Sequence, residues 1–89
     1  MLSYKSSTRE IDESGTETAV LSVGATEQFG PNLPMHLDTL IAEIYAKSFG
    51  EALNAYVLQT IPFNTSEEHA NCKGTITVSP NGFREWIYE

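Results

Sequence analysis

The stretch that most constrains this chain runs from Ala19 to Asp38 and reads AVLSVGATEQFGPNLPMHLD. It begins as an apolar run, which predicts a strand over residues 19–24, and then breaks into a turn rich in Gly, Pro and Asn. Open α/β sheets bind their ligands in polar loops that follow the carboxyl ends of buried strands. We therefore expect an α/β fold with a candidate site in this loop.

The loop contains two carboxylates and one imidazole, on Glu27, Asp38 and His36. Such a set of oxygen and nitrogen donors suits a divalent cation. The other interpretation is structural, with Asp38 as the N-cap residue of a following helix. The two roles of Asp38 are compatible, since a carboxylate has two oxygens. Spacing alone leaves both interpretations open, because so short a pattern often matches by chance.

The residues after Asp38 predict a helix of about four turns and then a second buried strand at Tyr56–Ile61. Together with the first strand they form a right-handed βαβ unit, which brings the polar loop 64–71 beside the first loop. Alternation in Gly74–Ser79 predicts a third, edge strand, and Ser79-Pro80 predicts the start of a terminal helix. The stripe expected to pack in the core consists of Leu40, Ile41, Ile44, Tyr45, Phe49, Ala52 and Leu53.

The first 18 residues differ in character from the rest of the chain. They are polar and acidic, and we interpret residues 1–18 as a tail with one short helical turn near Thr8–Glu13. The folded α/β unit is then expected to span residues 19–89.

The segment Gly24–Thr39, GATEQFGPNLPMHLDT, resembles the pattern G-[ST]-x-E-Q-H-G-P-H-L-P-x-x-x-D-T of the creatininase family. Downstream, the run Ser66-Glu67-Glu68-His69 followed by Gly74-Thr75 resembles the family's second block, P…S-x-E-H…P-G-T. The resemblance covers about Ala19–Pro80 and corresponds to the N-terminal part of the family's domain.

This resemblance implies a three-layer α/β/α fold, here reduced to a small βαβ unit with about three strands. It also implies a metal-dependent amidohydrolase that acts on cyclic or small amides and is often hexameric. Glu27 and Asp38 fall on positions that ligate the metal pair, for which zinc or manganese is the expected ion. In the second block, we assign Ser66, Glu68 and His69 to substrate binding.

Two positions depart from the family pattern. Phe29 stands where the family has a metal-binding His, and Asn32 stands where it has a second His. Phenylalanine has no lone pair for a metal, so one ligand is missing. If the site holds a metal, His36, two residues before Asp38, is the candidate to replace the missing imidazole. Family members are also more than twice as long, and their remaining ligands and general base come from the part that has no counterpart here.

These departures favour a chain that is non-catalytic alone, holds no metal as an isolated chain, and acts as an assembly or binding subunit. The alternative is one half of a heteromeric metal-dependent amidohydrolase whose site a second chain completes. A third possibility is a fragment of a longer protein, against which the start at Met1 argues.

Composition narrows the classes of partner. A formal net charge of −7 with only five Lys and Arg residues argues against nucleic acid and against an anionic membrane surface. The single Cys72 predicts a reduced thiol in a cytoplasmic protein. An 89-residue chain buries little surface, and the apolar residues Phe83, Trp86 and Ile87 near its end need cover. We therefore expect a homo-oligomer or a complex with a second protein.

Overall fold

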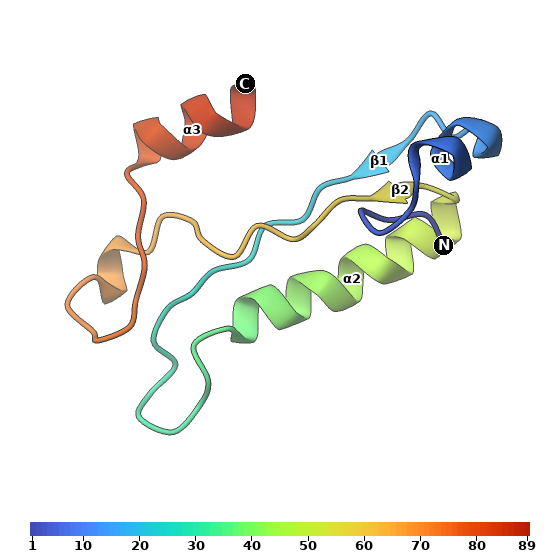
Figure 1. The fold of residues 1–89 in the computed structure, drawn as a ribbon. Helices are drawn as coiled ribbons and strands as arrows, with labels where there is room; N and C mark the ends of the chain where they lie inside the picture. Colours follow the sequence, from blue (N-terminus) through green and yellow to red (C-terminus); the bar gives the residue numbers. More distant parts are fainter.

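The fold is built around two short parallel strands. The structure is a computed structural model, and it describes residues 1–89. β1 (Ala19–Val20) pairs with β2 (Tyr56–Val57), with Ala19 opposite Tyr56 and Val20 opposite Val57. The helix α2 (Leu37–Leu53) connects them and runs along one side of the strands (Figure 1). This β–α–β order with a parallel pair confirms the predicted α/β class.

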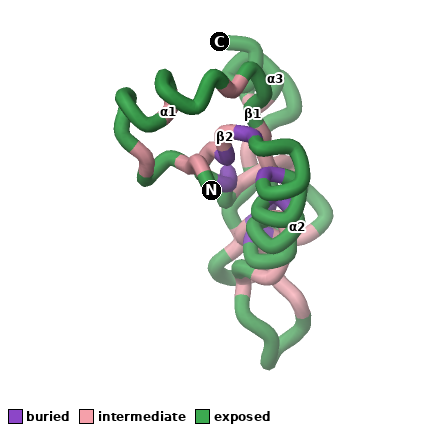
Figure 2. The backbone as a smooth tube through the Cα atoms, turned by 90° about the vertical axis from the view of Figure 1, so that its right-hand side faces the viewer, coloured by how far each residue is buried: buried purple, intermediate pink, exposed green.

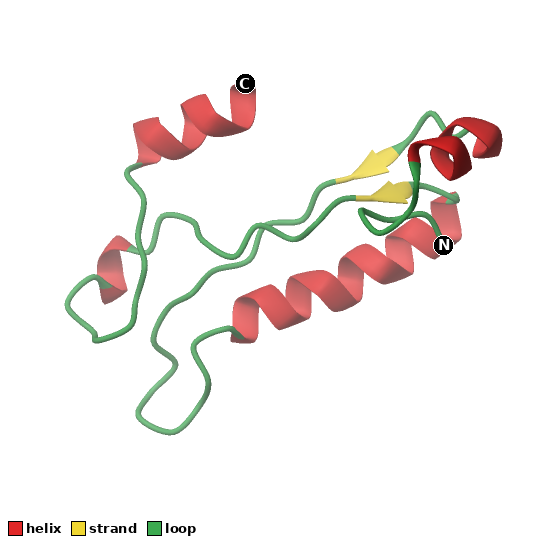
Figure 3. Cartoon of the chain, in the orientation of Figure 1, coloured by secondary structure: helices red, strands yellow, loops and turns green.

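Beyond these strands the two chain segments stay paired but lose the regular ladder, and most of the chain here is loop (Figure 3). Val23 and Ile61 form an isolated parallel bridge. The hydroxyl groups of Ser22 and Thr60 hydrogen-bond to each other across the pair at 2.7 Å. The predicted strands 19–24 and 56–61 are therefore neighbours, although regular strand structure covers only two residues of each.

Residues 75–78, which we call the clasp, do not form the predicted third strand. Within the clasp, Ile76 makes an antiparallel bridge to Thr26, whereas Thr77 makes a parallel bridge to Asn64. Because the clasp divides its backbone hydrogen bonds between two different loops, no continuous ladder develops along it. It instead ties together the loops that follow β1 and β2.

The N-terminal residues contain the expected short helix and also contact the strands. α1 (Thr8–Ser14) begins with a capping box in which the Ser7 hydroxyl accepts a hydrogen bond from the Glu10 N–H at 3.2 Å. Before it, Val57 N–H donates to the Leu2 carbonyl at 3.0 Å, and Tyr4 N–H donates to the Val57 carbonyl at 3.1 Å. The chain start thus lies along the free edge of β2, and the boundary at residue 18 stays a prediction.

The start of α2 differs from the sequence prediction. The N-cap residue is His36, whose side chain makes no capping hydrogen bond, and Asp38 lies within the first turn. The expectation that Asp38 is the N-cap residue was therefore wrong, because the helix begins earlier, at Leu37. The Asp38 carboxylate still lies near the positive end of the helix dipole.

The face of α2 that packs on the strands is made of small residues, and its buried positions are Thr39, Ala46 and Gly50. The large apolar side chains lie on the exposed side, where Tyr45 is 63% and Phe49 is 57% exposed. The predicted core stripe therefore faces outward, and Figure 2 shows the buried residues gathered where α2 meets the strands. We call the exposed set the outer face of α2; it consists of Leu40, Ile41, Ile44, Tyr45, Phe49 and Leu53.

Close packing explains why small residues were needed. A Cβ atom on Gly24 would collide with the Thr39 backbone, with its nitrogen only 2.8 Å away. A Cβ atom on Gly50 would collide with the Val57 side chain. Helix and strands therefore approach more closely than side chains of ordinary size would allow.

The terminal helix α3 (Pro80–Tyr88) begins as predicted, since the Ser79 hydroxyl accepts a hydrogen bond from the Gly82 N–H at 3.1 Å. α3 lies on the opposite side of the strands from α2 (Figure 1). Its Trp86 ring packs against Phe63 with a centroid distance of 5.6 Å. No helix in the chain has the length and apolar character that crossing a membrane requires.

We predict that Gly24→Ala lowers the free energy of unfolding by about 1–3 kcal/mol, because the added methyl group overpacks the contact with Thr39. Urea unfolding followed by circular dichroism measures this loss. The matched control is Gly82→Ala in α3, where an added Cβ would meet only side-chain atoms, the nearest being Ser79 Oγ at 3.0 Å. Equal effects of the two substitutions would contradict the close-packing argument.

Candidate functional site

A cavity of about 310 Å³ lies where the two loops leave the strands and meet the first turns of α2. The carboxyl ends of parallel strands are the expected location for a ligand site in an α/β fold. The polar side chains of this cavity come from three separate segments of the chain. It is lined by Val23, Gly24, Ala25, Glu27, Asp38, Ile41, Ala42, Asn64, Thr65, Ser66 and Glu68.

Thr39 fixes the first turn of α2 against the loop after β1. Its buried hydroxyl donates a hydrogen bond to the Ala25 carbonyl at 2.9 Å and accepts one from the Ala25 N–H at 3.2 Å. One side chain therefore satisfies both backbone groups of a buried loop residue. Because Asp38 precedes Thr39, this anchor also brings the Asp38 carboxylate up to Glu27.

The Glu27 and Asp38 carboxyl groups line the same cavity, and the neighbouring Asp38 carboxyl raises the pKa of Glu27 above its ordinary value. The hydrogen bond to Asp38 is the largest cause of the raised pKa, and burial of the Glu27 carboxyl adds to it. The Ser66 hydroxyl and His69 act in the opposite direction and lower this pKa. Two carboxylates this close need a proton or a cation between them.

A second group of donors shares Glu27. One ligand atom from each of Glu27, Glu68 and His69 lies within 4.8 Å of the other two. The His69 Nε2 and Glu68 Oε1 atoms are 4.0 Å apart. Glu68 and His69 belong to a 3₁₀ turn, Glu67–His69, in the loop after β2. Two oxygen donors and one imidazole nitrogen suit a divalent cation such as zinc or manganese.

Ser66 is the most deeply buried residue at the site, with 1% of its surface exposed. Its backbone N–H donates to the Thr77 hydroxyl of the clasp at 2.9 Å. Its own hydroxyl oxygen is buried in the cavity beside the Glu27 carboxyl, whose pKa it lowers. Because buried hydroxyl groups are normally satisfied, we count the Ser66 hydroxyl as part of the polar lining of the site.

The structure gathers most of the residues that the sequence singled out. Glu27 lies with Asp38 and also with Glu68 and His69, so residues from both polar loops meet at one site. His36 is different: it is exposed at the start of α2 and is absent from the donor group with Glu27. Its role as a metal ligand, like the substrate-binding roles in the second loop, stays a prediction.

Sequence reasoning missed two residues that support the site, Thr39 and Thr77. Thr39 is the last residue of the first family-like segment, so the pattern itself held the signal. Thr77 lies on the polar side of the alternating segment 74–79, and only the fold reveals that its hydroxyl holds the Ser66 N–H.

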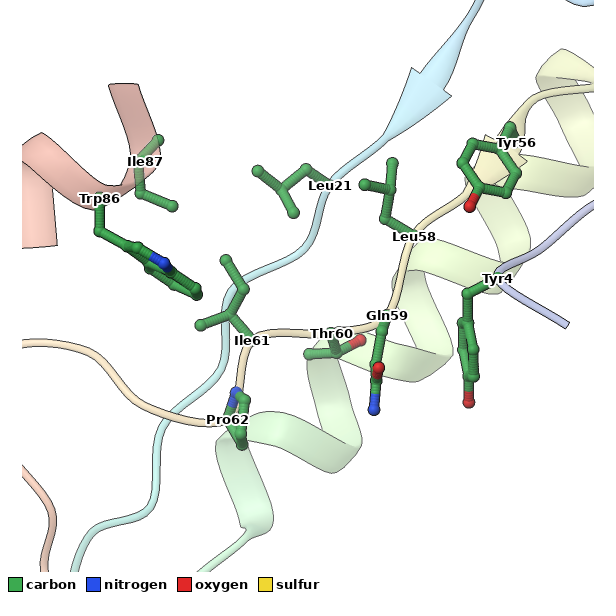
Figure 4. A pocket seen from close by; sticks show the side chains of 10 residues that line it. All are labelled: Tyr4, Leu21, Tyr56, Leu58, Gln59, Thr60, Ile61, Pro62, Trp86 and Ile87. Carbon is green, nitrogen blue, oxygen red and sulfur yellow. The ribbon is translucent and has the colours of Figure 1, made fainter. Parts of the chain in front are cut away.

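A larger cavity, of about 630 Å³, lies beside α3 and away from these donors. Figure 4 shows Trp86 and Ile87 on one side of it and Leu21 and Leu58 from the strand segments on the other. Its lining is mainly apolar and contains no carboxylate or imidazole. The smaller cavity is therefore the better candidate for an active site, because it contains the carboxylates that the larger cavity lacks.

Comparison with known proteins links this geometry to a family. A family model for creatininase, described as creatinine amidohydrolase, matches residues 4–89. The chain is 32% identical over 86 residues to the mycofactocin precursor peptide peptidase of Mycobacterium tuberculosis (strain ATCC 25618 / H37Rv), covering 85% of this chain and 34% of the relative. It is 28% identical over 79 residues to the protein of the same name from Mycobacterium ulcerans (strain Agy99), covering 79% of this chain and 32% of the relative. The chain thus spans about a third of the length of the curated relatives it matches.

The raised pKa of Glu27 predicts a pH dependence of stability with a definite sign. A carboxyl group whose pKa is higher in the folded state stabilises the fold at low pH, and this contribution is lost as the pH rises through the folded pKa. Glu27→Gln removes the titration, so the difference in melting temperature, variant minus wild type, should increase as the pH rises from the ordinary carboxyl pKa through the higher folded pKa. Glu51→Gln, on an exposed position of α2, is the control and should show a constant difference. A constant difference for Glu27→Gln as well would contradict the pairing of Glu27 with Asp38.

Proposed function

Because this chain belongs to the creatininase family, we propose that it supplies the metal-holding part of a hydrolase that cleaves amide C–N bonds. The family is typically metal-dependent, and the relatives reported above are named as peptidases. We propose further that the chain is inactive alone and acts when another polypeptide completes the site. The observation that carries this proposal is the pairing of Glu27 with Asp38 at the carboxyl ends of the strands.

The donor chemistry of the site fits the metal that the family implies. Glu27 and Asp38 would hold a zinc or manganese ion, whose charge relieves the repulsion between the two carboxylates. Such an ion supplies polarisation of the scissile carbonyl and activation of a water molecule. Phe29 contributes no ligand, so the set on this chain is short of one imidazole relative to the family pattern.

The chain's own residues position and bind the reacting groups. Thr39 holds Asp38 against Glu27 through its two hydrogen bonds to Ala25. The clasp holds Ser66 through Thr77, which places the buried Ser66 hydroxyl beside the Glu27 carboxyl in the cavity where a substrate oxygen would bind. These contacts orient the substrate before any bond is cleaved.

The proposed substrate is an amide bond in a peptide or in a small cyclic amide. The name of the mycobacterial relatives specifies a peptide substrate, whereas the family description specifies creatinine. Both substrates contain the same reacting group, a carbonyl carbon bonded to nitrogen. The free thiol of Cys72 suits a reducing compartment, and we propose the cytoplasm as the place of action.

A second candidate function is assembly, as a homo-oligomer or with a different chain. The observation that favours it is the outer face of α2, where large apolar side chains lie exposed in a row. The apolar cavity between α3 and the strands offers a second uncovered surface (Figure 4). Assembly through either surface is compatible with a hydrolytic site that a partner completes.

The hydrolase proposal is tested with the chain alone and with a chimera. In the chimera, this chain replaces the matching third of the Mycobacterium tuberculosis relative, and cleavage of that relative's peptide is followed by mass spectrometry. We expect no cleavage by the chain alone and zinc- or manganese-dependent cleavage by the chimera carrying Phe29→His. Glu27→Ala in this chimera should lower the rate at least about 100-fold, because it removes a ligand of the proposed ion. Metal-dependent cleavage by the chain alone would overturn the claim that it is incomplete.

The assembly proposal predicts an oligomer at low micromolar concentration, measured by light scattering after gel filtration. Tyr45→Lys combined with Phe49→Lys places two charges on the outer face of α2 and should shift the chain to a smaller species. Glu43→Lys together with Glu51→Lys is the control, since both positions are exposed on α2 but outside the apolar set. A well-folded wild-type monomer would contradict the proposal.

A further inference from the structure

We propose that the edge of β1 that faces away from β2 binds an extended strand of the polypeptide that completes the site, paired parallel to β1. This inference rests on the proposed function, because it names the surface through which that polypeptide joins this chain. We call this edge, over residues 19–24, the open edge. It differs from the two apolar surfaces described above, because backbone groups make the contact.

The open edge carries backbone groups that have no partner within the chain. Gly24 N–H donates to the Ile61 carbonyl at 2.8 Å, and Ile61 N–H donates to the Ser22 carbonyl at 3.0 Å. In a parallel pair this pattern turns the N–H and carbonyl groups of the residue between, Val23, to the opposite side. Neither Val23 nor Leu21 makes a backbone hydrogen bond within the chain. Two donors and two acceptors are therefore available, at the alternate spacing that an added strand requires.

The opposite edge of the strand pair is already covered by the chain itself. Residues 2–4 lie along β2, where Val57 N–H donates to the Leu2 carbonyl at 3.0 Å and Tyr4 N–H donates to the Val57 carbonyl at 3.1 Å. Ser3 forms a parallel bridge with Val57. The chain thus closes one edge by backbone pairing and leaves the same chemistry unused at the other.

The sequence of the open edge, AVLSVG, is typical of an interior strand. Natural edge strands are commonly protected against pairing by charged residues, especially Lys, or by Pro, and none occurs here. Continuous apolar runs belong instead to strands of parallel sheets that helices cover on both faces. The strand pair has this arrangement, with α2 on one side and α3 on the other (Figure 1). An interior type of strand at an edge indicates that a neighbouring strand binds there.

The side chains along the open edge define the kind of strand that fits. Leu21 is 49% and Val23 is 38% exposed, so both have apolar surface left to cover. Leu21 also lines the cavity of about 630 Å³ beneath Trp86 and Ile87 of α3 (Figure 4). No charged residue lines this cavity. The added strand should therefore present uncharged, apolar side chains toward α3.

The direction of the added strand follows from the sheet and from the site. The segments already paired, residues 2–4, β2 and β1, all run parallel. A further parallel strand ends at the same side of the sheet as β1, so the loop after it reaches the cavity that contains Glu27. That loop can supply the imidazole that Phe29 does not. The curated relatives are about three times as long as this chain, so their unmatched part is long enough to provide such a strand and loop.

Amide hydrogen exchange, followed by NMR, tests the pairing residue by residue. The probe is the chimera carrying Phe29→His, compared with the isolated chain. In the isolated chain, the Leu21 and Val23 amides should exchange freely, whereas the Gly24 amide is protected by its bond to Ile61. In the chimera, exchange at Leu21 and Val23 should slow at least about 100-fold, because both amides then donate to the added strand.

Three results would overturn the proposal. Protection of Leu21 and Val23 in the isolated chain would mean that a second copy covers the open edge. Free exchange of both amides in a chimera that still protects Gly24 would mean that the remaining polypeptide joins elsewhere. Loss of protection at Gly24 in the chimera would mean that the remaining polypeptide disrupts the strand pair instead of extending it.

A charge on the open edge provides a second measurement. Leu21→Lys should change the melting temperature of the isolated chain little, because the side chain is half exposed there, and should lower that of the chimera by at least about 5 °C. The matched control is Tyr4→Lys, at an exposed residue that lines the same cavity from the opposite edge. Equal losses from the two substitutions in the chimera would overturn the proposal.

Exchange and cleavage together separate this inference from the proposed function. Protected Leu21 and Val23 amides in a chimera that cleaves no peptide would support the strand pairing and overturn the hydrolase proposal. Metal-dependent cleavage by a chimera in which both amides exchange freely would do the reverse. Protection together with cleavage would support both.

Discussion

The contact between Gly24 and Thr39 is the constraint on which the rest of this structure depends. A Cβ atom at residue 24 would collide with the Thr39 backbone, so the loop after β1 reaches α2 only because it carries glycine there. Once the two segments touch, the Thr39 hydroxyl satisfies both backbone groups of Ala25. This pair of hydrogen bonds sets the position of the first turn of α2 and brings Asp38 to Glu27. The helix–strand packing and the site chemistry therefore share one anchor.

The same close approach explains which parts of the fold were predictable. The periodicity of apolar residues located α2, and two short continuous apolar runs located the paired segments. Together these patterns predicted the α/β class. Periodicity did not reveal the buried side of α2, because the residues that pack against the strands, Thr39, Ala46 and Gly50, are small. The large apolar side chains, on which the sequence prediction relied, lie on the outer face of α2, where Tyr45 and Phe49 are exposed. The prediction of a third strand was wrong for another reason. The backbone of the clasp bonds to two different loops instead of to one strand.

The location of the candidate site could be predicted from the sequence, and so could some of the residues that form it. A strand followed by a polar loop, and a parallel connection to a second such loop, were enough to place Glu27 near Ser66, Glu68 and His69. Spacing alone did not show which imidazole lies near Glu27, because nearness in sequence favoured His36 over His69. His36 lies at the start of a helix that points its side chain to solvent, while the 3₁₀ turn carries His69 back toward Glu27. Irregular loops set such directions through contacts that a linear pattern does not contain.

The clasp has a consequence for the order of events during synthesis. Both loops of the site are translated before it, yet each depends on it: Gln28 N–H donates to the Thr75 hydroxyl, and Ser66 N–H donates to the Thr77 hydroxyl. On a ribosome, the β1–α2–β2 unit can therefore dock while these loops still lack their final hydrogen-bond partners. The loops become fixed only after Val78 has left the exit tunnel. In a nascent chain the scaffold is therefore complete in sequence before the residues that hold the loops of the site.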